Sequence, residues 1–527
     1  NPMKNYLGLI FLLFAFTAIA QNNRSALLPM PNHIEQLQSK PFSLTGKNIS
    51  IHPEQPELKF AATTLQAILK DRMQINIPLS GSRQSAIRLT IDPQLNGKEH
   101  YKLKIDQKGI TISGASAAAV FYGVMTVDQI LLGDVCTTNR KEMAAVSIDD
   151  APRFGYRALM LDPARHFLPI EDVKFYIDQM VRYKYNVLQL HLTDDQGWRM
   201  EIKKHPKLTA GQPFYTQEEL TDLIHYAAER HIEIIPELDI PGHTVAVLAA
   251  YPELGCTHTD TIEKNVGKTV DLMLCANNEK VYTVYKDIID EVSALFPSRY
   301  IHLGGDEAVI EKNWTKCERC QKMMKELKYE KASQLMIPFF DRMLSFVRAD
   351  GKEPILWCEL DNIRMPANDY LFPYPKDVTL VSWRYGLTPT CQELTRQHGN
   401  PLIMAPGEFA YLDYPQFKGD LPEFNNWGMP VTTLETCYQF DPGYGRPASE
   451  QAHILGVMGT LWGEAIKDIN RVTYMTYPRG LALAEAGWTQ MEHRSWDSFK
   501  ERLYPNLTNL MKNGVSVRVP FEIVKRK

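Results

Sequence analysis

The sequence predicts an α/β protein: a (β/α)8 barrel of the TIM type, preceded by a small α+β domain. Three observations support this prediction. The chain has 527 residues, more than a single ordinary core holds. Short strands with two helices fill its first part, whereas a repeated order of strand, loop and helix begins near residue 152. Charged and aromatic residues directly follow the later strands, as they do at the functional face of a barrel.

Residues 1–20 have the pattern of a secretory signal peptide. Lys4 supplies positive charge, an apolar run extends from Leu7 to Ala15, and Ala18-Ile19-Ala20 offers a small-residue cleavage site. The run is too short for a comfortable transmembrane helix. We therefore expect export to the periplasm or the extracellular space, without stable membrane insertion. The net charge of -4 gives no reason to expect nucleic acid as a partner.

Residues 21–151 are predicted to form the α+β domain. Apolar residues recur at helical spacing in Glu57–Arg72, and a second helix is expected at Ser116–Leu132 with Ser116 as its cap. Strands are expected at Ala86–Ile91, Tyr101–Ile105 and Gly109–Gly114. Because this region contains no cluster of titratable side chains, we expect it to support the next domain structurally.

Residues 152–527 are predicted to form the barrel. Eight short apolar strands are expected, at Ala158–Leu161, Val187–His191, Ile232–Pro236, Tyr300–Leu303, Ile355–Trp357, Thr379–Ser382, Leu402–Met404 and Val457–Leu461. Helices are expected between them, for example at Ile170–Lys184, Gln217–Arg230, Lys280–Phe296 and Gln334–Ala349. The stretches after the fifth and seventh strands are irregular, so the boundaries there are the least defined.

The residues that follow these strands define the candidate site. In chain order they are Asp162 and Arg165; Asp194, Asp195 and Trp198; Glu237, Asp239 and His243; Asp306 and Glu307; Trp357 and Glu359; Trp383 and Arg384; Tyr411 and Asp413; and Trp462 and Glu464. The carboxyl ends of barrel strands meet at one face, which carries the active site in barrel enzymes. For Asp239 and Glu359 we expect salt bridges at the barrel rim instead of a chemical role.

The stretch from Tyr300 to Glu307 is the centre of this site. A short apolar strand ends in Gly304 and Gly305, and the adjacent carboxylates of Asp306 and Glu307 follow. Glycines let the backbone turn sharply there, so the alternation of side chains breaks and both carboxylates can face one site. Crowded carboxylates repel each other, so we expect one raised pKa. The alternative is an acidic start of the polar helix that follows.

His302 to Glu307 read H-L-G-G-D-E, which resembles the signature of the β-N-acetylhexosaminidases, glycoside hydrolase family 20, in their bacterial, secreted form. Further motifs of that family lie in the expected order: Leu161–Arg165 (L-D-P-A-R), His191–Trp198 (H-L-T-D-D-Q-G-W), Pro241–His243 (P-G-H), Tyr411–Asp413 (Y-L-D) and Leu461–Glu464 (L-W-G-E). The resemblance implies a TIM barrel and an exo-acting, retaining enzyme. Its partner would be a glycan or oligosaccharide with a terminal non-reducing, β-linked GlcNAc or GalNAc, and no cofactor or metal is implied.

The resemblance also implies a role for each catalytic side chain. Glu307 would be the general acid, while the substrate's own 2-acetamido oxygen would attack the anomeric carbon and form an oxazolinium ion. Asp306 would orient the acetamido group and stabilise its charge, and Tyr411 would donate a hydrogen bond to its oxygen. His243 with Asp195, or with the neighbouring Asp194, resembles a relay behind the acid.

Other family positions would bind the sugar. Three tryptophans resemble those that enclose the acetamido methyl and stack beneath the ring: Trp357, Trp383 and Trp462. Three charged residues correspond to those that bind the 3-, 4- and 6-hydroxyls through charge-assisted hydrogen bonds: Arg165, Asp413 and Glu464. Two carboxylates there would close the pocket beyond the terminal sugar.

The eight cysteines are too few for a disulfide scaffold in a chain of this length. Cys317 and Cys320 have C-x-x-C spacing, but no second pair or nearby histidine completes a zinc set, so we expect a local disulfide or two free thiols. Cys256 and Cys275 flank a polar loop and are the best candidates for a bridge.

Two other functions remain open at this point. A metal-dependent barrel hydrolase is one, because His166, His191, His243 and His302 lie near strand ends beside carboxylates. The H-x-H pair expected on the first strand of amidohydrolase-type barrels is missing. A glycan-binding barrel without catalysis is the other, although a binding protein has no need of an acid beside the scissile oxygen.

Overall fold

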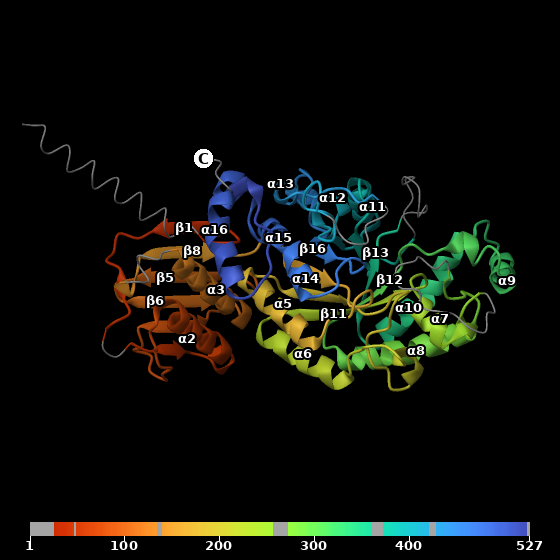
Figure 1. Ribbon diagram of the computed structural model, residues 1–527, viewed down its shortest axis with the longest axis horizontal. Coiled ribbons are helices and arrows are strands. Elements are labelled where there is room, and N and C mark those ends of the chain that lie inside the picture. The colour runs from red at the N-terminus through yellow and green to blue at the C-terminus, as the bar shows by residue number, and fades with distance from the viewer. Residues whose placement is uncertain are drawn as a thin grey trace, which may run out of the picture.

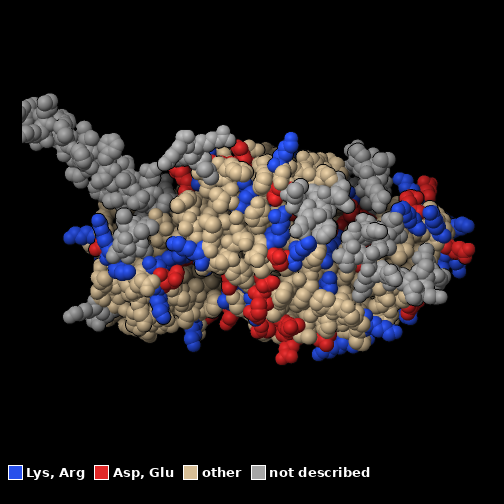
Figure 2. Space-filling view, in the orientation of Figure 1, with Lys and Arg blue, Asp and Glu red and all other residues tan. Residues whose placement is uncertain are grey.

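A computed structural model describes residues 26–46, 49–133, 140–256, 272–359, 373–420 and 428–523. Figure 1 shows an N-terminal domain built on a β-sheet and, beside it, a larger barrel with surrounding helices. The fold class predicted from the sequence is thereby confirmed. The expected signal peptide lies outside the described residues. Figure 2 shows side chains of both charges interspersed over the face in view.

The N-terminal domain contains a six-stranded sheet in the order β1-β8-β5-β6-β4-β3. Its strands are β1 (His33–Gln36), β3 (Ile51–Pro53), β4 (Ile87–Ile91), β5 (Tyr101–Asp106), β6 (Gly109–Gly114) and β8 (Val146–Asp150). A two-stranded sheet joins β2 (Phe42–Ser43) to β7 (Glu142–Met143). Helices α2 (Lys59–Met73) and α3 (Ala117–Gly133) pack together, and α3 also contacts β4, β5 and β6. The predicted helices and the strands β4, β5 and β6 are confirmed.

The barrel closes through eight parallel strands in the order β10-β11-β12-β13-β14-β15-β16-β9. The strands are β9 (Tyr156–Leu161), β10 (Val187–His191), β11 (Glu233–Ile240), β12 (Tyr300–Gly304), β13 (Glu353–Trp357), β14 (Thr379–Ser382), β15 (Leu402–Met404) and β16 (Ile454–Leu461). Each overlaps one predicted strand. Within the barrel, buried apolar side chains such as Met160, Ile235, Ile355 and Met458 form a separate core cluster. This packing provides a solid floor beneath the carboxyl ends of the strands.

One strand differs in length from the prediction. We expected the third barrel strand to end at Pro236, with Glu237 and Asp239 in the loop beyond it. Strand β11 instead continues to Ile240, because Glu237 pairs with His302 of β12 and Ile240 pairs with Gly304. Both acidic residues are therefore buried within the strand. A buried carboxylate needs partners, and the neighbouring strands provide them.

Helices surround the barrel and connect its strands. They include α5 (Ile170–Arg182), α6 (Gln217–Glu229), α8 (Glu279–Leu295), α10 (Met336–Ala349), α11 (Thr388–His398), α14 (Ile469–Thr476) and α15 (Arg479–Trp488). The connection after β15 is irregular, as expected, and contains only the short helices α12 (Gly407–Ala410) and α13 (Leu434–Gln439) and the 3-10 turn η6 (Ala448–Glu450) among its described residues. None of the described helices is both long and apolar enough to cross a membrane.

The two domains are joined by polar contacts as well as by apolar packing. Arg157 of β9 forms a salt bridge of 2.8 Å with Glu99, and the buried Lys184 lies 3.6 Å from Asp150 of β8. The C-terminal helix α16 (Trp496–Lys512) returns to the N-terminal domain, where Arg502 donates to the carbonyl of Leu27. The domains therefore share a polar and partly charged interface.

None of the seven cysteines in the described ranges forms a disulfide. The expected bridge between Cys256 and Cys275 is wrong for this structure. Their thiols instead meet those of Cys317 and Cys320, so that the missing second pair beside the C-x-x-C motif comes from a distant part of the sequence.

Candidate active site

The predicted site residues converge at the carboxyl ends of the barrel strands. Arg165 follows β9, and its guanidinium lies 2.9 Å from Asp194 after β10 and 3.7 Å from Glu464 after β16. His243, after β11, lies 3.7 Å from Asp306 and 3.6 Å from Glu307 after β12. Side chains from the first and last strands of the barrel therefore face a common space, as the barrel topology requires.

The turn after β12 presents both carboxylates to this space. Gly304 and Gly305 have φ angles of 67° and 100°, and Glu307 itself has a φ of 48°. A side chain on Gly304 would place its Cβ 1.7 Å from Oδ1 of Asp239. Glycine is therefore required at that position, because backbone and carboxylate approach too closely for any side chain. The backbone N–H of Gly305 donates to the same carboxylate at 3.2 Å.

The two carboxyl groups differ in environment. Asp306 is buried, and burial together with the charge of Glu307 raises its pKa, although His243 opposes the rise. The side chain of Glu307 is 51% exposed. Its partial burial favours a raised pKa, but His243, Arg384 and Arg165 outweigh that effect, so the pKa of Glu307 is lowered. The expected raised pKa therefore belongs to Asp306.

His243 connects these carboxyl groups to a buried network. Its Nδ1 lies 3.2 Å from Asp194, and Asp194 in turn contacts His191 at 2.6 Å. Burial lowers the pKa of His243, but Asp194 and Glu307 more than compensate, and its pKa is raised well above the ordinary value. The sequence left the partner of His243 open between Asp194 and Asp195, and the geometry identifies Asp194. Asp195 instead accepts the backbone N–H of Val245 at 3.1 Å, and burial raises its pKa to about 6.

The network continues to His191 and Glu237, to which the sequence analysis assigned no role in the proposed chemistry. His191 lies between Asp194 and Glu237, which is 2.9 Å from its Nδ1, and Glu237 accepts a hydrogen bond of 2.7 Å from the indole of Trp357. The position of His191 and Glu237 at the ends of adjacent strands was visible in the sequence. Their pairing depends on the register between β10 and β11, which aligns the two residues.

Aromatic rings form one wall of the site. The ring of Trp462 lies 5.5 Å from Trp357 and 6.3 Å from Tyr411, and the guanidinium of Arg165 lies 5.3 Å from the Trp462 ring. Trp383 follows β14 and packs against the barrel core, with the guanidinium of Arg384 4.2 Å from its ring. Trp357 and Trp462 thus lie side by side, and Trp383 packs against the same core cluster.

Several polar atoms of the site are buried without a hydrogen-bond partner among the described residues. They are Oδ1 of Asp306, the hydroxyl of Tyr411, Oδ1 of Asp413, Nε2 of His243 and Nε1 of Trp383. Buried polar atoms are rarely left unpaired, so each such atom needs an explanation. Unpaired donors and acceptors at the carboxyl ends of the strands are available to bind a polar ligand.

Asp413 and Glu464 form an acidic part of the site. Burial raises the pKa of Asp413 well above its usual range, and Glu464 adds to the rise. Glu464 is 46% exposed and stands opposite Arg165. Acceptors and a guanidinium in this arrangement suit a ligand with several hydroxyl groups.

The two acidic residues expected in rim salt bridges behave differently. Glu359 pairs with Arg384 at 3.1 Å, as expected, and burial raises its pKa to about 8 despite that partner. For Asp239 the expectation is wrong: within the described part of the chain it forms no ion pair with Lys or Arg. It is buried beside Asp306, and burial and that neighbour raise its pKa well above the usual range. Asp239 supports the glycine turn after β12.

The site also contains three overlapping groups with metal-ligand atoms within 4.8 Å of one another: His191, Glu237 and Asp239; Asp194, Asp195 and His243; and Asp239, His243 and Asp306. Their main carboxylates already have cationic partners, since Asp194 contacts Arg165 and Glu237 contacts His191. A metal ion would have to compete with these partners. The donor set therefore favours a proton-transfer network over a metal centre.

Comparisons with known proteins identify the family of this chain. The model of the glycosyl hydrolase family 20 catalytic domain matches residues 154–491, and that of domain 2 of the same family matches residues 24–151. A β-hexosaminidase of Akkermansia muciniphila is 37% identical over 420 residues, covering 76% of this chain and 82% of that protein. A β-hexosaminidase of Porphyromonas gingivalis is 34% identical over 516 residues, covering 94% of this chain and 64% of that protein.

A solved structure of the same family is also similar to this chain. The family 20 exo-β-N-acetylglucosaminidase of Vibrio harveyi, in complex with N-acetylglucosamine, has a TM-score of 0.81 and 31% identity, covering 95% of this chain and 79% of that one. With both family models matched and relatives above 30% identity over most of its length, this chain is a glycoside hydrolase that belongs to glycosyl hydrolase family 20.

Proposed function

We propose that the protein is an exo-acting, retaining β-N-acetylhexosaminidase that uses the acetamido group of its substrate as the nucleophile. The observation that supports this most strongly is the pair after β12. Asp306 offers a buried, unpaired carboxyl oxygen, while the side chain of the neighbouring Glu307 is half exposed. Two carboxyl groups in such different environments suit two different roles.

In the first step the acetamido oxygen attacks the anomeric carbon while Glu307 donates a proton to the leaving oxygen. Asp306 accepts the acetamido N–H and stabilises the positive charge that develops, and the hydroxyl of Tyr411 donates to the acetamido oxygen. In the second step Glu307 removes a proton from water, and the resulting hydroxyl attacks the anomeric carbon from the face that the leaving group left. This attack opens the oxazolinium ion. The configuration is therefore retained.

This sequence of steps needs a proton on Glu307 and a charge on Asp306, the reverse of the pKa order that the protein's own groups produce. A bound sugar corrects this in two ways. It displaces water from the exposed half of Glu307, which raises the pKa of that group. The acetamido N–H donates to Asp306, which lowers the pKa of that carboxyl.

The acidic part of the site and one relative support the exo-acting mode. In the proposed mode, Asp413, Glu464 and Arg165 bind the hydroxyls of the terminal sugar through charge-assisted hydrogen bonds. The Vibrio harveyi relative is itself an exo-acting enzyme and was solved in complex with N-acetylglucosamine.

We further propose that the enzyme is exported. The apolar segment after Lys4 supports this proposal, and cell fractionation tests it.

The deciding experiment compares an aryl β-N-acetylglucosaminide with the matching aryl β-glucoside, which lacks the acetamido group. Only the first should be hydrolysed, and NMR should detect the β-anomer as its first product. Asp306→Asn should reduce that turnover strongly, because the acetamido group loses its charged partner. Efficient cleavage of the glucoside, or the α-anomer as first product, would contradict the mechanism. Binding without turnover would instead support a glycan-binding barrel.

A further inference from the structure

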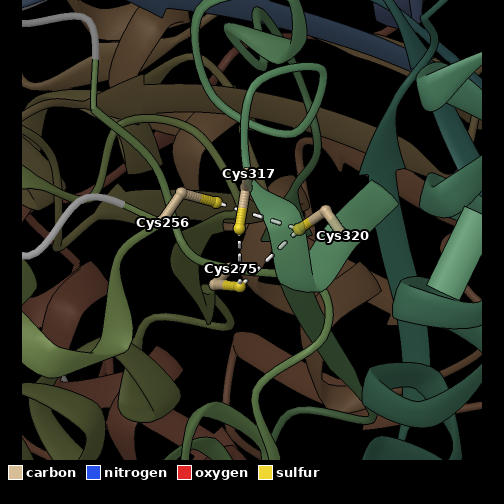
Figure 3. A group of neighbouring side chains, drawn as sticks. All are labelled: Cys256, Cys275, Cys317 and Cys320. Atoms are coloured by element: carbon tan, nitrogen blue, oxygen red, sulfur yellow. Dashed lines mark hydrogen bonds between the residues drawn. The ribbon is translucent and has the colours of Figure 1, made fainter. Parts of the chain in front are cut away.

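Four cysteines from separate parts of the sequence meet outside the active site. Cys256 and Cys275 bound the segment that connects the 3-10 turn η3 (Pro252–Leu254) to helix α8, whereas Cys317 and Cys320 lie at the start of helix α9 (Glu318–Glu326). Figure 3 shows their side chains pointing toward one another, with the sulfur atoms around a common centre. All four sulfur atoms lie within 4.8 Å of one another.

The spacing of these sulfur atoms has a chemical meaning. Sγ of Cys275 lies 3.8 Å from that of Cys317 and 3.6 Å from that of Cys320, and Cys256 lies 3.9 Å from Cys320. Four thiolates around one zinc ion, at about 2.3 Å each, form a tetrahedron with edges of about 3.8 Å. A disulfide would require about 2.05 Å. The three distances match the tetrahedron.

The surroundings also suit a closed metal centre. Cys275, Cys317 and Cys320 are buried and Cys256 is partly buried. Cys317 is the N-cap residue of α9, and Cys320 follows within its first turn, so the positive end of the helix dipole favours thiolates there. The guanidinium of Arg319 donates a hydrogen bond of 2.8 Å to the carbonyl of Gly255 and adds positive charge near the cysteines. These features offset the net negative charge of a zinc tetrathiolate.

Backbone and side-chain contacts connect the cluster to the catalytic loops. Leu274, next to Cys275, donates its N–H to the carbonyl of Pro241, and the indole of Trp314 donates to the carbonyl of Leu274 at 2.9 Å. Pro241 lies two residues before His243, and Trp314 lies seven residues after Glu307. The cluster thus joins the segment after β11 to the segment after β12.

We propose that these four cysteines bind one structural zinc ion, which fastens the loop of His243 to the loop of Asp306 and Glu307. All four positions of the ion are filled by sulfur, so it has no open position for substrate or water. Each thiol loses its proton on binding, and Zn²⁺ replaces these protons without any change of oxidation state. This proposal does not depend on the proposed hydrolytic mechanism.

The first test measures zinc in the full-length protein, purified without added metal or chelator. Elemental analysis should give one zinc per chain, and Co²⁺ exchanged into the protein should show the charge-transfer absorption of a tetrathiolate site. The double variant Cys317→Ser/Cys320→Ser should lose the zinc and unfold at a lower temperature. The matched control Cys391→Ala removes a buried cysteine outside the cluster and should keep the zinc.

Mass spectrometry of non-reduced peptides provides a second readout, which applies even if the double variant does not fold. Alkylation after unfolding in the presence of a chelator should label all four cysteines as free thiols. Two disulfides within the cluster and no zinc in the wild-type protein would overturn the proposal. Zinc that remains bound in the folded double variant would also overturn it, because the ion would then lie elsewhere, for example among the carboxylates of the active site.

Discussion

At the scale of single residues, His243 affects the pKa of both carboxyl groups that follow β12. It lies between Asp306 and Glu307 and is itself kept protonated by Asp194. Its positive charge lowers the pKa of both neighbours relative to what burial alone would produce. A single side chain can therefore shift the pKa of Glu307, the proposed acid, and that of Asp306, the proposed acetamido-binding group, in the same direction.

Glu307→Gln should abolish hydrolysis of substrates with poor leaving groups. A general acid typically contributes a factor of about a hundred to ten thousand, and glutamine cannot donate its proton in this way. An activated aryl substrate should lose less, because its leaving group needs little protonation. Measuring kcat/KM for both substrates checks this, with circular dichroism as a control for folding. Equal losses on both substrates would contradict the role of Glu307 as acid.

His243→Asn should move the pH profile of kcat/KM to higher pH on both limbs. Loss of the histidine charge raises the pKa of Asp306 and of Glu307, and kcat/KM reports groups of the free enzyme. The two limbs belong to the coupled pair of carboxyls and not to either one alone. Tyr411→Phe, the control, should lower the rate without moving the limbs. Unchanged limbs in His243→Asn would show that the histidine acts only by packing.

At the scale of elements, the sequence predicts the barrel strands and the residues that follow them, but not how side chains from different segments pair. The barrel strands can be predicted from the sequence because their burial requires apolar runs. The position of each polar residue that follows a strand can be predicted in the same way. The sequence could not show that His243 contacts Asp194 and not Asp195, because this depends on how the two adjacent side chains after β10 are oriented. The cysteine cluster was missed because its pairs are separated by more than 40 residues.

Gly304→Ala tests the turn after β12. The substitution should cost about 1–2 kcal/mol for the left-handed backbone, plus a larger cost for the contact with Asp239. Gly351→Ala is the matched control, because Gly351 has a φ of 73° and no atom lies within 4 Å of the place where an alanine Cβ would stand. We expect the control to lose only the backbone part of the unfolding free energy, whereas Gly304→Ala should also lose activity. Equal destabilisation of the two variants would show that the turn adjusts freely.

At the scale of the whole molecule, a charged group is buried where the two domains meet. Lys184 donates to the hydroxyl of Tyr101 at 3.1 Å and lies 3.6 Å from Asp150, both in the N-terminal domain. Burial lowers its pKa to about 8, although Asp150 opposes the shift. Asp150 also accepts a hydrogen bond of 3.0 Å from the indole of Trp488, so Lys184 is not its sole partner.

This depressed pKa predicts how stability changes with pH. Between about pH 8 and 10.5 the lysine is neutral in the folded protein and protonated in the unfolded chain. The unfolded chain then binds the extra proton, so the contribution of Lys184 to stability rises with pH across this range and is constant below it. The shift from 10.5 to about 8 corresponds to roughly 3 kcal/mol.

Lys184→Met isolates this contribution, because methionine keeps the apolar stem and cannot be protonated. Lys184 already has a φ of 61°, and methionine bears the same backbone cost, so the comparison is matched. The thermal midpoint of the wild type, relative to that of Lys184→Met, should rise between pH 8 and 10.5 and stay level from pH 6 to 8. A constant difference over the whole range would mean that Lys184 stays charged in the folded interface and that Asp150 compensates fully for its burial.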